Sequence, residues 1–481
     1  MSGHGTWDVI IVGAGSAGLP AAIFAAQRGA RVLQIEADGR IGGTLYWSSG
    51  QISAAGTRLQ KQLGIEDNWE EHYKDAQRIA HDTIDPVLGK LATKNAADTW
   101  EWLIDLGLKP DPEVPLAGSG HEFFRTRRYY WGANKAVSLL EVIRPELEKL
   151  VAAGKIALRL GTRMTKLVQD ASGRVTGIET ERNGVKETFQ APNVVLTTGG
   201  YAANPELWKE LTPNAVLRSV CNPYSRGEGI VAARSVGAKV DGGDKFLCSF
   251  GGVLEDPKDP LNTTVGFIFV PQKRTPWEIW VNGSGKRFVR EDHPSVDHRE
   301  RALRAQKDQQ MYVVFDEGIW QNAPTLDGVR GRDWLGQRFG NHPHYSKADT
   351  LAGLAQQMGV DAKALEETVT RYNAAIDSGK DAEFGREMLP RKIEKGPFYA
   401  LHAAGFSVVS PAGINADEQL RVTDKAGKPI PGLYAAGEIL GFSRLSGDAF
   451  VNGMSLMPAL TFGRLLGQKI LGWDKTRAAA E

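Results

Sequence analysis

The chain has 481 residues, more than the roughly 250–300 at which a single hydrophobic core stops growing, so we expect two domains. Its 58 Lys and Arg residues balance 57 Asp and Glu residues, and the formal net charge of +1 excludes the strong field that gathers nucleic acid or an anionic membrane. The cysteines are Cys221 and Cys248, without a CxxC or a Cys/His cluster, so we expect neither a disulfide framework nor a metal site.

The N-terminal sequence MSGHGTWD has no basic stretch followed by an apolar run. Elsewhere, no segment approaches 18 uninterrupted apolar residues, the length that a membrane-spanning helix needs. We therefore expect a cytoplasmic protein that does not span a membrane and whose partner is a small molecule.

The first motif is DVIIVGAGSAGLPAAIFAAQRGARVLQIEA, from Asp8 to Ala37. It predicts a buried strand, an Ala-rich helix and a second strand, with Gly13, Gly15 and Gly18 in GxGxxG spacing between the first strand and the helix. The glycines permit a tight turn, close approach of a pyrophosphate and close helix packing, while the helix N-terminus faces the phosphates. Glu36 ends the second strand, where a carboxylate accepts hydrogen bonds from a ribose. Together these features predict a dinucleotide site.

The segment that follows, ADGRIGGTLYWSSGQ, is glycine-rich and irregular. It resembles the flavoprotein subunits of fumarate reductases and succinate dehydrogenases, together with their relatives the 3-ketosteroid dehydrogenases. In that family a GG(N/T)-x-x-x-S-x-G segment wraps FAD, and Gly42, Gly43, Thr44, Ser48 and Gly50 match it. Family members with covalent flavin have a histidine just after the GG pair. GGTLYWSSGQ has none, so the resemblance implies non-covalent FAD.

Further matches are spread along the chain. NVVLTTGGYAANPEL (193–207) resembles the strand and Gly-Gly turn against the cofactor, and IWVNGSGKRFVRED (279–292) resembles a hairpin of the substrate domain. GLYAAGEILG (432–441) resembles the strand whose acid, here Glu438, bonds the ribityl chain. GMSLMPALTFGRLLGQKIL (453–471) resembles the helix that points its N-terminus at the flavin N1/O2 edge, and is most like the ketosteroid dehydrogenases.

The resemblance implies an α/β fold, with a Rossmann-like FAD-binding domain and an inserted α+β capping domain. We expect the FAD-binding domain at 1–220 and 392–481 and the capping domain at 221–391, where strand-like WEIWVNGSGKRFV and MYVVFDEGIW precede two helical segments. The expected cofactor-binding residues are Gly13, Gly15, Ser16, Ala17, Gly18, Glu36, Ala37, Gly42, Gly43, Thr44, Ser48, Gly50, Met164, Thr198, Gly199, Gly437, Glu438, Ser455 and Leu456.

The chain differs from the fumarate reductases at positions where that family binds the carboxylates of its substrate. Trp320 stands where the resemblance places an arginine acid, and Val408 and Val409 where it places a histidine pair. With Phe450, these residues are the expected substrate-lining set, and they favour a neutral, partly apolar substrate. Arg444, in SRLSGD, resembles a carboxylate-binding arginine; it is either a substrate anchor or a structural residue.

The ketosteroid dehydrogenases use one tyrosine as a base, and a glycine N–H with a second tyrosine to polarise the ketone. Gly453 takes the place of that glycine, but the second tyrosine falls at Ala449. Tyr129 and Tyr130 are the candidate base, activated by the nearby Arg125, Arg127 and Arg128, or else their rings only pack the cap against the flavin domain. None of the nine histidines falls in a catalytic motif; His121 lies near these tyrosines.

These observations predict an FAD-dependent oxidoreductase acting on CH–CH bonds, which desaturates a neutral cyclic ketone or ketosteroid-like compound. One alternative is an ene reductase for an unsaturated carboxylic acid, anchored by Arg444; a more distant one is a flavin redox sensor without catalysis. No second GxGxxG follows a strand, so electrons must pass to or from a diffusible partner of unknown identity.

Overall fold

The computed structural model describes residues 7–473, and its internal contacts divide the chain into two compact units. Unit 1 holds the described residues up to Asn214, Cys221–Phe246, and those from Val409 onward; unit 2 holds Ala215–Val220 and Leu247–Val408. These boundaries differ from those expected from the sequence. Cys221–Phe246 stays with unit 1 because its strand β10 (Val240–Asp241) pairs with β17 (Gly413–Ile414).

The main sheet of unit 1 has six strands in the order β18-β19-β9-β1-β2-β5. The apolar runs VIIV and VLQI form β1 (Val9–Val12) and β2 (Val32–Ile35), which pair in parallel and are buried along their whole length. Strand β9 (Val194–Leu196) continues the parallel pairing on the other side of β1. A separate antiparallel sheet has the order β6-β7-β8. This confirms the predicted Rossmann-like arrangement of strand, helix and strand.

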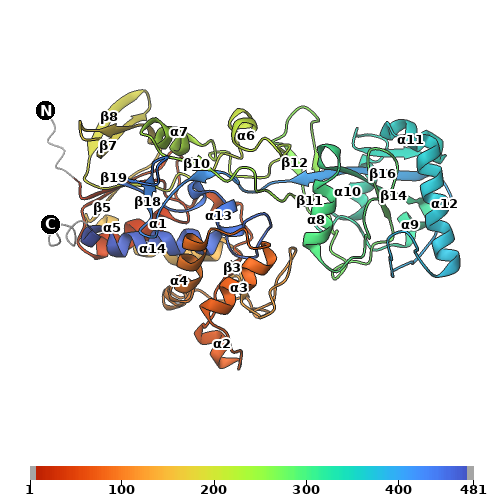
Figure 1. Cartoon of the computed structure of the whole chain (residues 1–481), viewed down its shortest axis with the longest axis horizontal. Coiled ribbons are helices and arrows are strands. Elements are labelled where there is room, and N and C mark those ends of the chain that lie inside the picture. Colours follow the sequence, from red (N-terminus) through yellow and green to blue (C-terminus); the bar gives the residue numbers. More distant parts are fainter. Residues whose placement is uncertain (1–6, 474–481) are drawn as a thin grey trace. The chain divides into compact units, whose positions relative to one another are not determined.

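Helices α1 (Gly18–Gln27) and α14 (Leu456–Trp473) pack closely beside the sheet, next to α5 (Figure 1). Small residues allow this approach. A methyl group at Gly463 would lie 2.1 Å from the carbonyl oxygen of Ala17, and one at Gly467 would lie 2.6 Å from that of Ala21. The start of α14 is thereby fixed relative to the turn that precedes α1.

The remaining elements of unit 1 are β3 (Ile52–Ser53), β4 (Tyr129–Tyr130), β5 (Ile156–Arg159), β6 (Arg163–Gln169), β7 (Val175–Arg182), β8 (Val185–Gln190), β18 (Arg421–Thr423), β19 (Pro429–Ala435), α2 (Arg58–Gln62), α3 (Trp69–Ile79), α4 (Pro86–Asp105), α5 (Val137–Ala152), α6 (Pro205–Leu211), α7 (Glu228–Ser235), α13 (Ser443–Ser446) and the 3-10 turns η1 (Gly43–Tyr46) and η3 (Glu438–Leu440).

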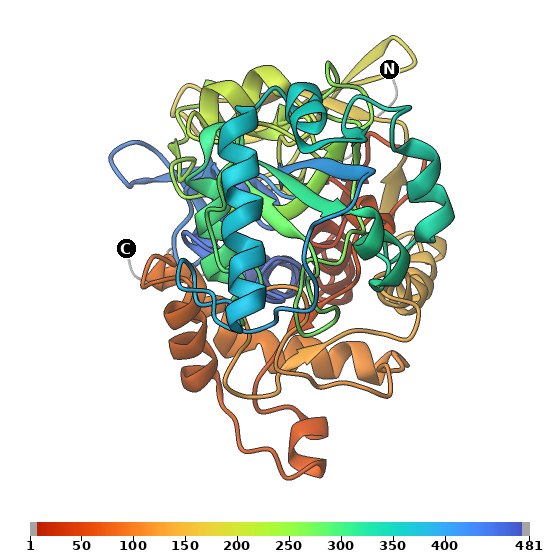
Figure 2. The ribbon, with the colours of Figure 1, turned by 90° about the vertical axis from the view of Figure 1, so that its right-hand side faces the viewer.

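Unit 2 is built on an antiparallel sheet in the order β12-β11-β16-β14-β13, with β15 also paired to β16. The predicted antiparallel strands are confirmed, since Ile279 pairs with Val314. The two expected helical segments are α11 and α12, but the start of the first one joins strand β15. Figure 2 shows α12 as the cyan helix nearest the viewer.

The elements of unit 2 are β11 (Ser249–Leu254), β12 (Thr263–Thr264), β13 (Ile279–Val281), β14 (Gln310–Asp316), β15 (Tyr345–Ala348), β16 (Phe398–Phe406), α8 (Val296–Arg304), α9 (Glu317–Asn322), α10 (Gly331–Arg338), α11 (Leu351–Met358), α12 (Ala362–Ser378) and η2 (Lys307–Gln309).

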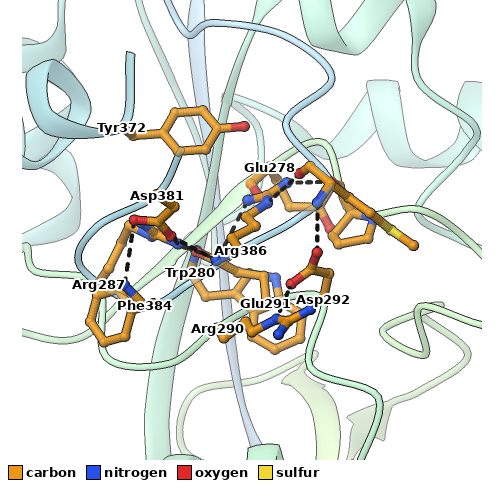
Figure 3. A network of polar contacts seen from close by, with 12 residues as sticks. Glu278, Trp280, Arg287, Arg290, Glu291, Asp292, Tyr372, Asp381, Phe384 and Arg386 are labelled. Atoms are coloured by element: carbon orange, nitrogen blue, oxygen red, sulfur yellow. Dashed lines mark hydrogen bonds and ion pairs between the residues drawn. The ribbon is translucent and has the colours of Figure 1, made fainter. Parts of the chain in front are cut away.

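A buried network of charges ties the hairpin after β13 to the loop after α12 (Figure 3). Arg287 lies 2.6 Å from the carboxylate of Glu291 and 2.9 Å from that of Asp381, and all three side chains are at most 2% exposed. The guanidinium of Arg386 donates to the carbonyl oxygen of Glu278, and the backbone N–H of Arg386 donates to the carboxylate of Asp381 at 3.2 Å. The guanidinium of Arg386 also lies 3.5 Å from the carboxylate of Glu291, so each charged side chain has an ion-pair partner and the network joins two distant segments of unit 2.

No helix among residues 7–473 is long and apolar enough to cross a membrane. Most of the N-terminal sequence that we used to predict the cellular compartment lies outside the described residues.

Candidate active site

Three glycine-containing motifs from distant parts of the chain meet at the start of α1. The N–H of Gly42 donates to the carbonyl oxygen of Ala14 at 2.8 Å, and a methyl group at Gly43 would lie 3.3 Å from the Cα of Gly15. Gly437, from the C-terminal part of the chain, lies close to Ala17. A methyl group added at Gly437 would lie 3.1 Å from the Cβ of Ala17. The structure therefore brings these predicted cofactor residues together.

The turn at the start of α1 leaves open space on one side. Gly13, Gly15 and Ser16 are partly exposed, although the strand before them is buried. A methyl group at Gly15 would meet no heavy atom within 4 Å, whereas one at Gly18 would lie 2.1 Å from the carbonyl oxygen of Gly13. Gly18 is thus required by packing, and Gly15 borders a cradle that fits a pyrophosphate at a helix N-terminus.

The end of β2 carries the expected acid. The carboxylate of Glu36 accepts hydrogen bonds from the N–H groups of Ala14 at 2.7 Å and Asp38 at 2.9 Å. Burial raises the pKa of Glu36, while these two hydrogen bonds lower it. The N–H of Thr162 donates to the carbonyl oxygen of Glu36 at 2.8 Å, so Met164 on β6 and the partly exposed Ala37 lie in the same region. Glu36 thereby links the strand end to the phosphate turn.

Another acid lies where β9 and β19 end. Glu438 accepts a hydrogen bond from the N–H of Ser410 at 2.8 Å, and burial raises its pKa to about 6. A methyl group at Gly200 would lie 2.3 Å from the Glu438 carboxylate, which places the preceding Thr198 and Gly199 beside this acid. The hydroxyl of Thr198 is buried and has no hydrogen-bond partner among the described residues. A methyl group at Gly229 would lie 2.0 Å from this hydroxyl, and a buried hydroxyl without a protein partner fits a polar ligand.

Two of the predicted residues shape the loop after η1. Ser48 accepts a hydrogen bond from the N–H of Gly50 at 3.0 Å, and the N–H of Ser48 donates to the carbonyl oxygen of Thr44. Gly50 has φ +75°, and an added methyl group would lie 2.3 Å from the backbone nitrogen of Ala136. Ser48 and Gly50 therefore hold this loop against the start of α5.

The N-terminus of α14 is reached through a left-handed glycine. Gly453 has φ +75°, and a methyl group there would lie 2.4 Å from the backbone nitrogen of Ser53 on β3. Ser455, just before the helix, is partly exposed, and Leu456 is its first residue. The first N–H groups of a helix have no partner within it, so this end attracts negative charge.

Aromatic rings lie immediately before this helix start. The ring of Phe450 stacks on His121, with centroids 3.7 Å apart and an interplanar angle of 17°, and lies 5.0 Å from Phe442. Phe450 and His121 are both partly exposed. The sequence identified Phe450 as a substrate-lining residue, but it gave no sign of this stack.

The structure does not place the two candidate tyrosines in an open groove. Tyr129 and Tyr130 form β4 and are at most 1% exposed. Burial raises the pKa of both phenols. The hydroxyl of Tyr130 is hydrogen-bonded to that of Thr57 at 2.8 Å, and its ring packs on Trp100. These surroundings disfavour an ionised phenol and correct the expectation that the pair supplies a base.

Arg128, one of the arginines expected to activate these phenols, is occupied by carboxylates. Arg128 is buried and binds the carboxylates of Asp67 at 2.7 Å and Asp75 at 3.0 Å. Since its charge is already compensated, it does little to stabilise a phenolate.

Arg444 is held by carboxylates of unit 1. Its guanidinium lies 3.0 Å from the carboxylate of Asp85 and also pairs with Asp241 and the side-chain oxygen of Asn415. Asp241 in turn pairs with Lys239 at 2.9 Å. The two basic and two acidic side chains give the cluster no net charge, which favours the structural interpretation over a carboxylate anchor.

The remaining predicted substrate-lining residues belong to different units. Trp320 lies in the aromatic core of unit 2, stacked on Tyr399 with centroids 5.7 Å apart, and borders a small cavity with Phe315 and Arg332. Val408 is also in unit 2 and is 38% exposed, whereas Val409 belongs to unit 1 and is buried. Within residues 7–473, no group of three or more His, Cys, Asp and Glu side chains could hold a metal ion.

Comparison with known proteins assigns the chain to a family. Residues 8–449 match the FAD binding domain family. A fumarate reductase (cytochrome) of Shewanella frigidimarina is 32% identical over 480 residues, which cover 98% of this chain and 78% of that protein. A more distant relative, the 4-oxocyclohexanecarboxylate 2-dehydrogenase of Sinomonas cyclohexanicum, is 25% identical over 562 residues, covering 99% of this chain and 95% of the relative.

The fold agrees with this assignment. The structure of 3-ketosteroid delta1-dehydrogenase from Sterolibacterium denitrificans, in complex with 1,4-androstadiene-3,17-dione, superposes with a TM-score of 0.76 at 22% identity, covering 99% of this chain and all of that one. The chain belongs to the FAD-dependent fumarate reductase and succinate dehydrogenase flavoprotein family, and it is an FAD-dependent oxidoreductase that acts on CH–CH groups.

Proposed function

We propose that the cofactor residues of unit 1 hold FAD without a covalent bond. The cradle beside Gly15 takes the pyrophosphate, Glu36 accepts hydrogen bonds from the ribose, and Glu438 accepts one from the ribityl chain. The N-terminus of α14, at Ser455 and Leu456, would hold the N1/O2 edge of the flavin, where its partial positive charge would stabilise negative charge on the cofactor. When bound, FAD accepts a hydride from the substrate.

We propose further that the substrate is a neutral cyclic ketone or ketosteroid-like compound, which loses two hydrogens to form an α,β C=C bond. The observation that carries this proposal is the state of Arg444. Its guanidinium is paired with Asp85 and Asp241, so it has no uncompensated charge for a carboxylate. The similarity to a dehydrogenase that acts on a cyclic ketone, 4-oxocyclohexanecarboxylate, supports the reaction type.

The residues before α14 supply the ketone site in this proposal. The N–H of Gly453 polarises the ketone oxygen, which makes the neighbouring C–H bond more acidic. Phe450 and Val409 provide apolar surface on unit 1. Trp320 and Val408 of unit 2 are the other substrate-lining residues that the sequence predicts. The electrons then leave for a diffusible acceptor, such as a quinone, a dye or O₂.

Reduction of an unsaturated carboxylic acid is the second candidate. The 32% identity to a fumarate reductase favours it. In this alternative the substrate carboxylate displaces Asp85 or Asp241 from Arg444. A redox sensor without catalysis has no support from these relatives.

Steady-state turnover distinguishes the two candidates. The holoenzyme is assayed with dichlorophenolindophenol as acceptor and with cyclohexanone or androst-4-ene-3,17-dione as donor. A second assay uses reduced methyl viologen as donor and fumarate as acceptor. We expect turnover in the first assay and none above background in the second. Fumarate reduction without ketone oxidation would overturn the proposal in favour of the second candidate.

A further inference from the structure

We propose that His344 and His402 of unit 2 form an acid-sensitive switch. At neutral pH the two imidazoles share one proton and hold residues 340–344, the turn before β15, against β16; a second proton releases this turn. The proposal does not depend on the proposed substrate. Four observations support it: the short distance between the rings, the partner that sets the tautomer of His402, the unpartnered nitrogen of His344, and the buried Arg218 near both rings.

The two rings face each other through the same type of nitrogen. Nδ1 of His344 lies 2.9 Å from Nδ1 of His402, which is a hydrogen-bond distance. A hydrogen bond between two imidazole nitrogens needs one N–H and one lone pair. The two nitrogens therefore share a single proton, and a proton on each of them would leave two N–H groups pointing at one another.

Gln310 determines which of the two rings donates. Nε2 of His402 lies 2.7 Å from the side-chain oxygen of Gln310 on β14, and an amide oxygen only accepts hydrogen bonds. Nε2 of His402 thus carries a hydrogen, and Nδ1 of the neutral ring has a lone pair. From these partners, Nδ1 of His344 is assigned as the donor. The ring of His402 is also held in its plane, because it stacks on Tyr312 with centroids 4.5 Å apart.

A second proton has no favourable position while the turn is in place. Nε2 of His344 has the remaining lone pair, but this atom is buried and has no hydrogen-bond partner among the described residues. A proton there would create a buried N–H group on a charged ring without an acceptor, which is costly. A proton on Nδ1 of His402 would break the bond between the rings. The ordered turn therefore disfavours the second proton.

Arg218 places a positive charge near both rings. It is 6% exposed, and its guanidinium donates to the carbonyl oxygen of Asp308 at 3.0 Å. Burial, then His344 and then Arg218 lower the pKa of His402 from 6.5 to about 3. A second proton on the pair would add a positive charge beside this guanidinium, which opposes protonation of the folded protein.

Two further titratable groups lie next to His344. Its backbone N–H donates to Nδ1 of His342 at 3.2 Å, and Nε2 of His342 lies 3.1 Å from the carbonyl oxygen of Glu255. Burial, followed by His342 and Arg218, lowers the pKa of His344, whereas Glu255, which pairs with Arg338, raises it. Because the net shift is downward, the ordered turn is favoured above pH 6.5 and loses stability as the pH decreases.

The turn is the part of this region that is able to move. It is mostly exposed, whereas Tyr345, the first residue of β15, is fully buried and pairs with Leu401 on β16. The N–H of His402 donates to the carbonyl oxygen of His344 at 2.9 Å, so the rings and the backbone hold the turn at the same place. Release therefore frees residues 340–344 and leaves β15 paired with β16.

Amide hydrogen exchange followed by mass spectrometry measures the release of the turn. The FAD-loaded protein is compared at pH 7 and pH 5, and the intrinsic rate at each pH is divided by the measured rate to give a protection factor. The double variant His344→Asn/His402→Gln removes both titrating rings. His298→Gln is the matched control, because His298 stacks on His293 in unit 2, with centroids 4.1 Å apart, but is exposed.

In the wild type, we expect the protection of residues 340–345 to fall about tenfold between pH 7 and pH 5, as the titration of one histidine allows. Strand β13 should keep its protection, and His298→Gln should behave like the wild type. In the double variant, the protection of the turn should be the same at both pH values. Three results would overturn the proposal: a change under threefold in the wild type, a tenfold fall that persists in the double variant, or an equal loss of protection in β13.

A second measurement uses the wild type alone, in case the double variant does not fold. The protein is labelled with ¹⁵N-histidine and titrated from pH 7 to pH 5. The ring nitrogens of the pair should take up the second proton over the pH range in which the turn loses its protection. Rings that stay neutral while the turn opens would contradict the switch.

Discussion

The guanidinium of Arg444 on α13 lies 3.0 Å from the carboxylate of Asp85, and the N–H of Asp85 donates to the carbonyl oxygen of Arg444 at 2.9 Å. Asp85 also caps α4, since its carboxylate accepts hydrogen bonds from the N–H groups of Val87 and Leu88. The pair therefore joins α13 to the start of α4, and the arginine that most resembles a carboxylate anchor has a structural partner.

Replacing Arg444 should affect stability more than substrate affinity. In Arg444→Met, the partly buried carboxylates of Asp85 and Asp241 lose a partner, and we expect the free energy of unfolding to fall by about 1–2 kcal/mol. Urea denaturation measures this loss. Lys74→Met is the control, because the Lys74–Glu71 pair is exposed and its removal should leave the free energy of unfolding nearly unchanged. The KM for a ketone should stay within about threefold; a tenfold rise in KM for a carboxylate with unchanged stability would assign Arg444 to the substrate instead.

Two glycines of the same motif should respond in opposite ways to alanine. Gly15→Ala places a methyl group in open space, so the melting temperature of the FAD-free protein should not change, while FAD binding weakens at least about tenfold. Gly18→Ala places its methyl group against the carbonyl oxygen of Gly13, so the FAD-free protein itself should be destabilised. Thermal denaturation and fluorescence titration with FAD measure the two effects. Equal loss of stability in both variants would show that the space beside Gly15 is not a ligand cradle.

The charge network of Figure 3 should dominate the stability of unit 2. Arg287→Met leaves the carboxylates of Glu291 and Asp381 buried without this partner, and we expect a loss of about 3–5 kcal/mol in the free energy of unfolding. The exposed Arg58, whose partners are Glu101 and Asp105, provides the control Arg58→Met, which should leave the free energy of unfolding nearly unchanged. A small effect of Arg287→Met would mean that water enters this region and compensates the charges.

Unit 2 should become less stable in acid through His402. Its ring stacks on Tyr312, and its Nδ1 lies 2.9 Å from the Nδ1 of His344. Burial, followed by the nearby charges of His344 and Arg218, lowers the pKa of His402 from 6.5 to about 3. Between these values the folded protein binds fewer protons than the unfolded chain, so stability is present above pH 6.5 and falls as the pH decreases toward 3.

Urea denaturation at pH 7 and pH 5 tests this dependence. The wild type should lose about 1–2 kcal/mol more than His402→Gln between the two values, because glutamine does not titrate. An equal loss in both proteins would assign the acid sensitivity to other groups.

Local sequence patterns predicted the elements around the cofactor. The apolar runs of β1 and β2, the glycine turn and Glu36 all follow from residues close together in the sequence, and the structure adds that the turn meets Gly43 and Gly437. The substrate side could not be predicted in this way. Whether Tyr130 is buried against Trp100, whether Arg444 meets Asp85 or whether His121 stacks on Phe450 depends on contacts between residues distant in the sequence. The sequence also predicted that the capping domain begins at residue 221, whereas Cys221–Phe246 lies in unit 1. This segment stays there because β10 pairs with β17, which is far away in the chain.

A single-turnover measurement shows whether this flavoenzyme oxidises a neutral ketone. Oxidised holoenzyme is mixed anaerobically with androst-4-ene-3,17-dione or cyclohexanone, and the flavin absorbance near roughly 450 nm is recorded. We expect that a ketone bleaches this band, and that fumarate added to the reduced enzyme does not restore it. Two results together would contradict ketone oxidation. The band of the oxidised enzyme would persist after either ketone is added, and the band of the reduced enzyme would return rapidly after fumarate is added.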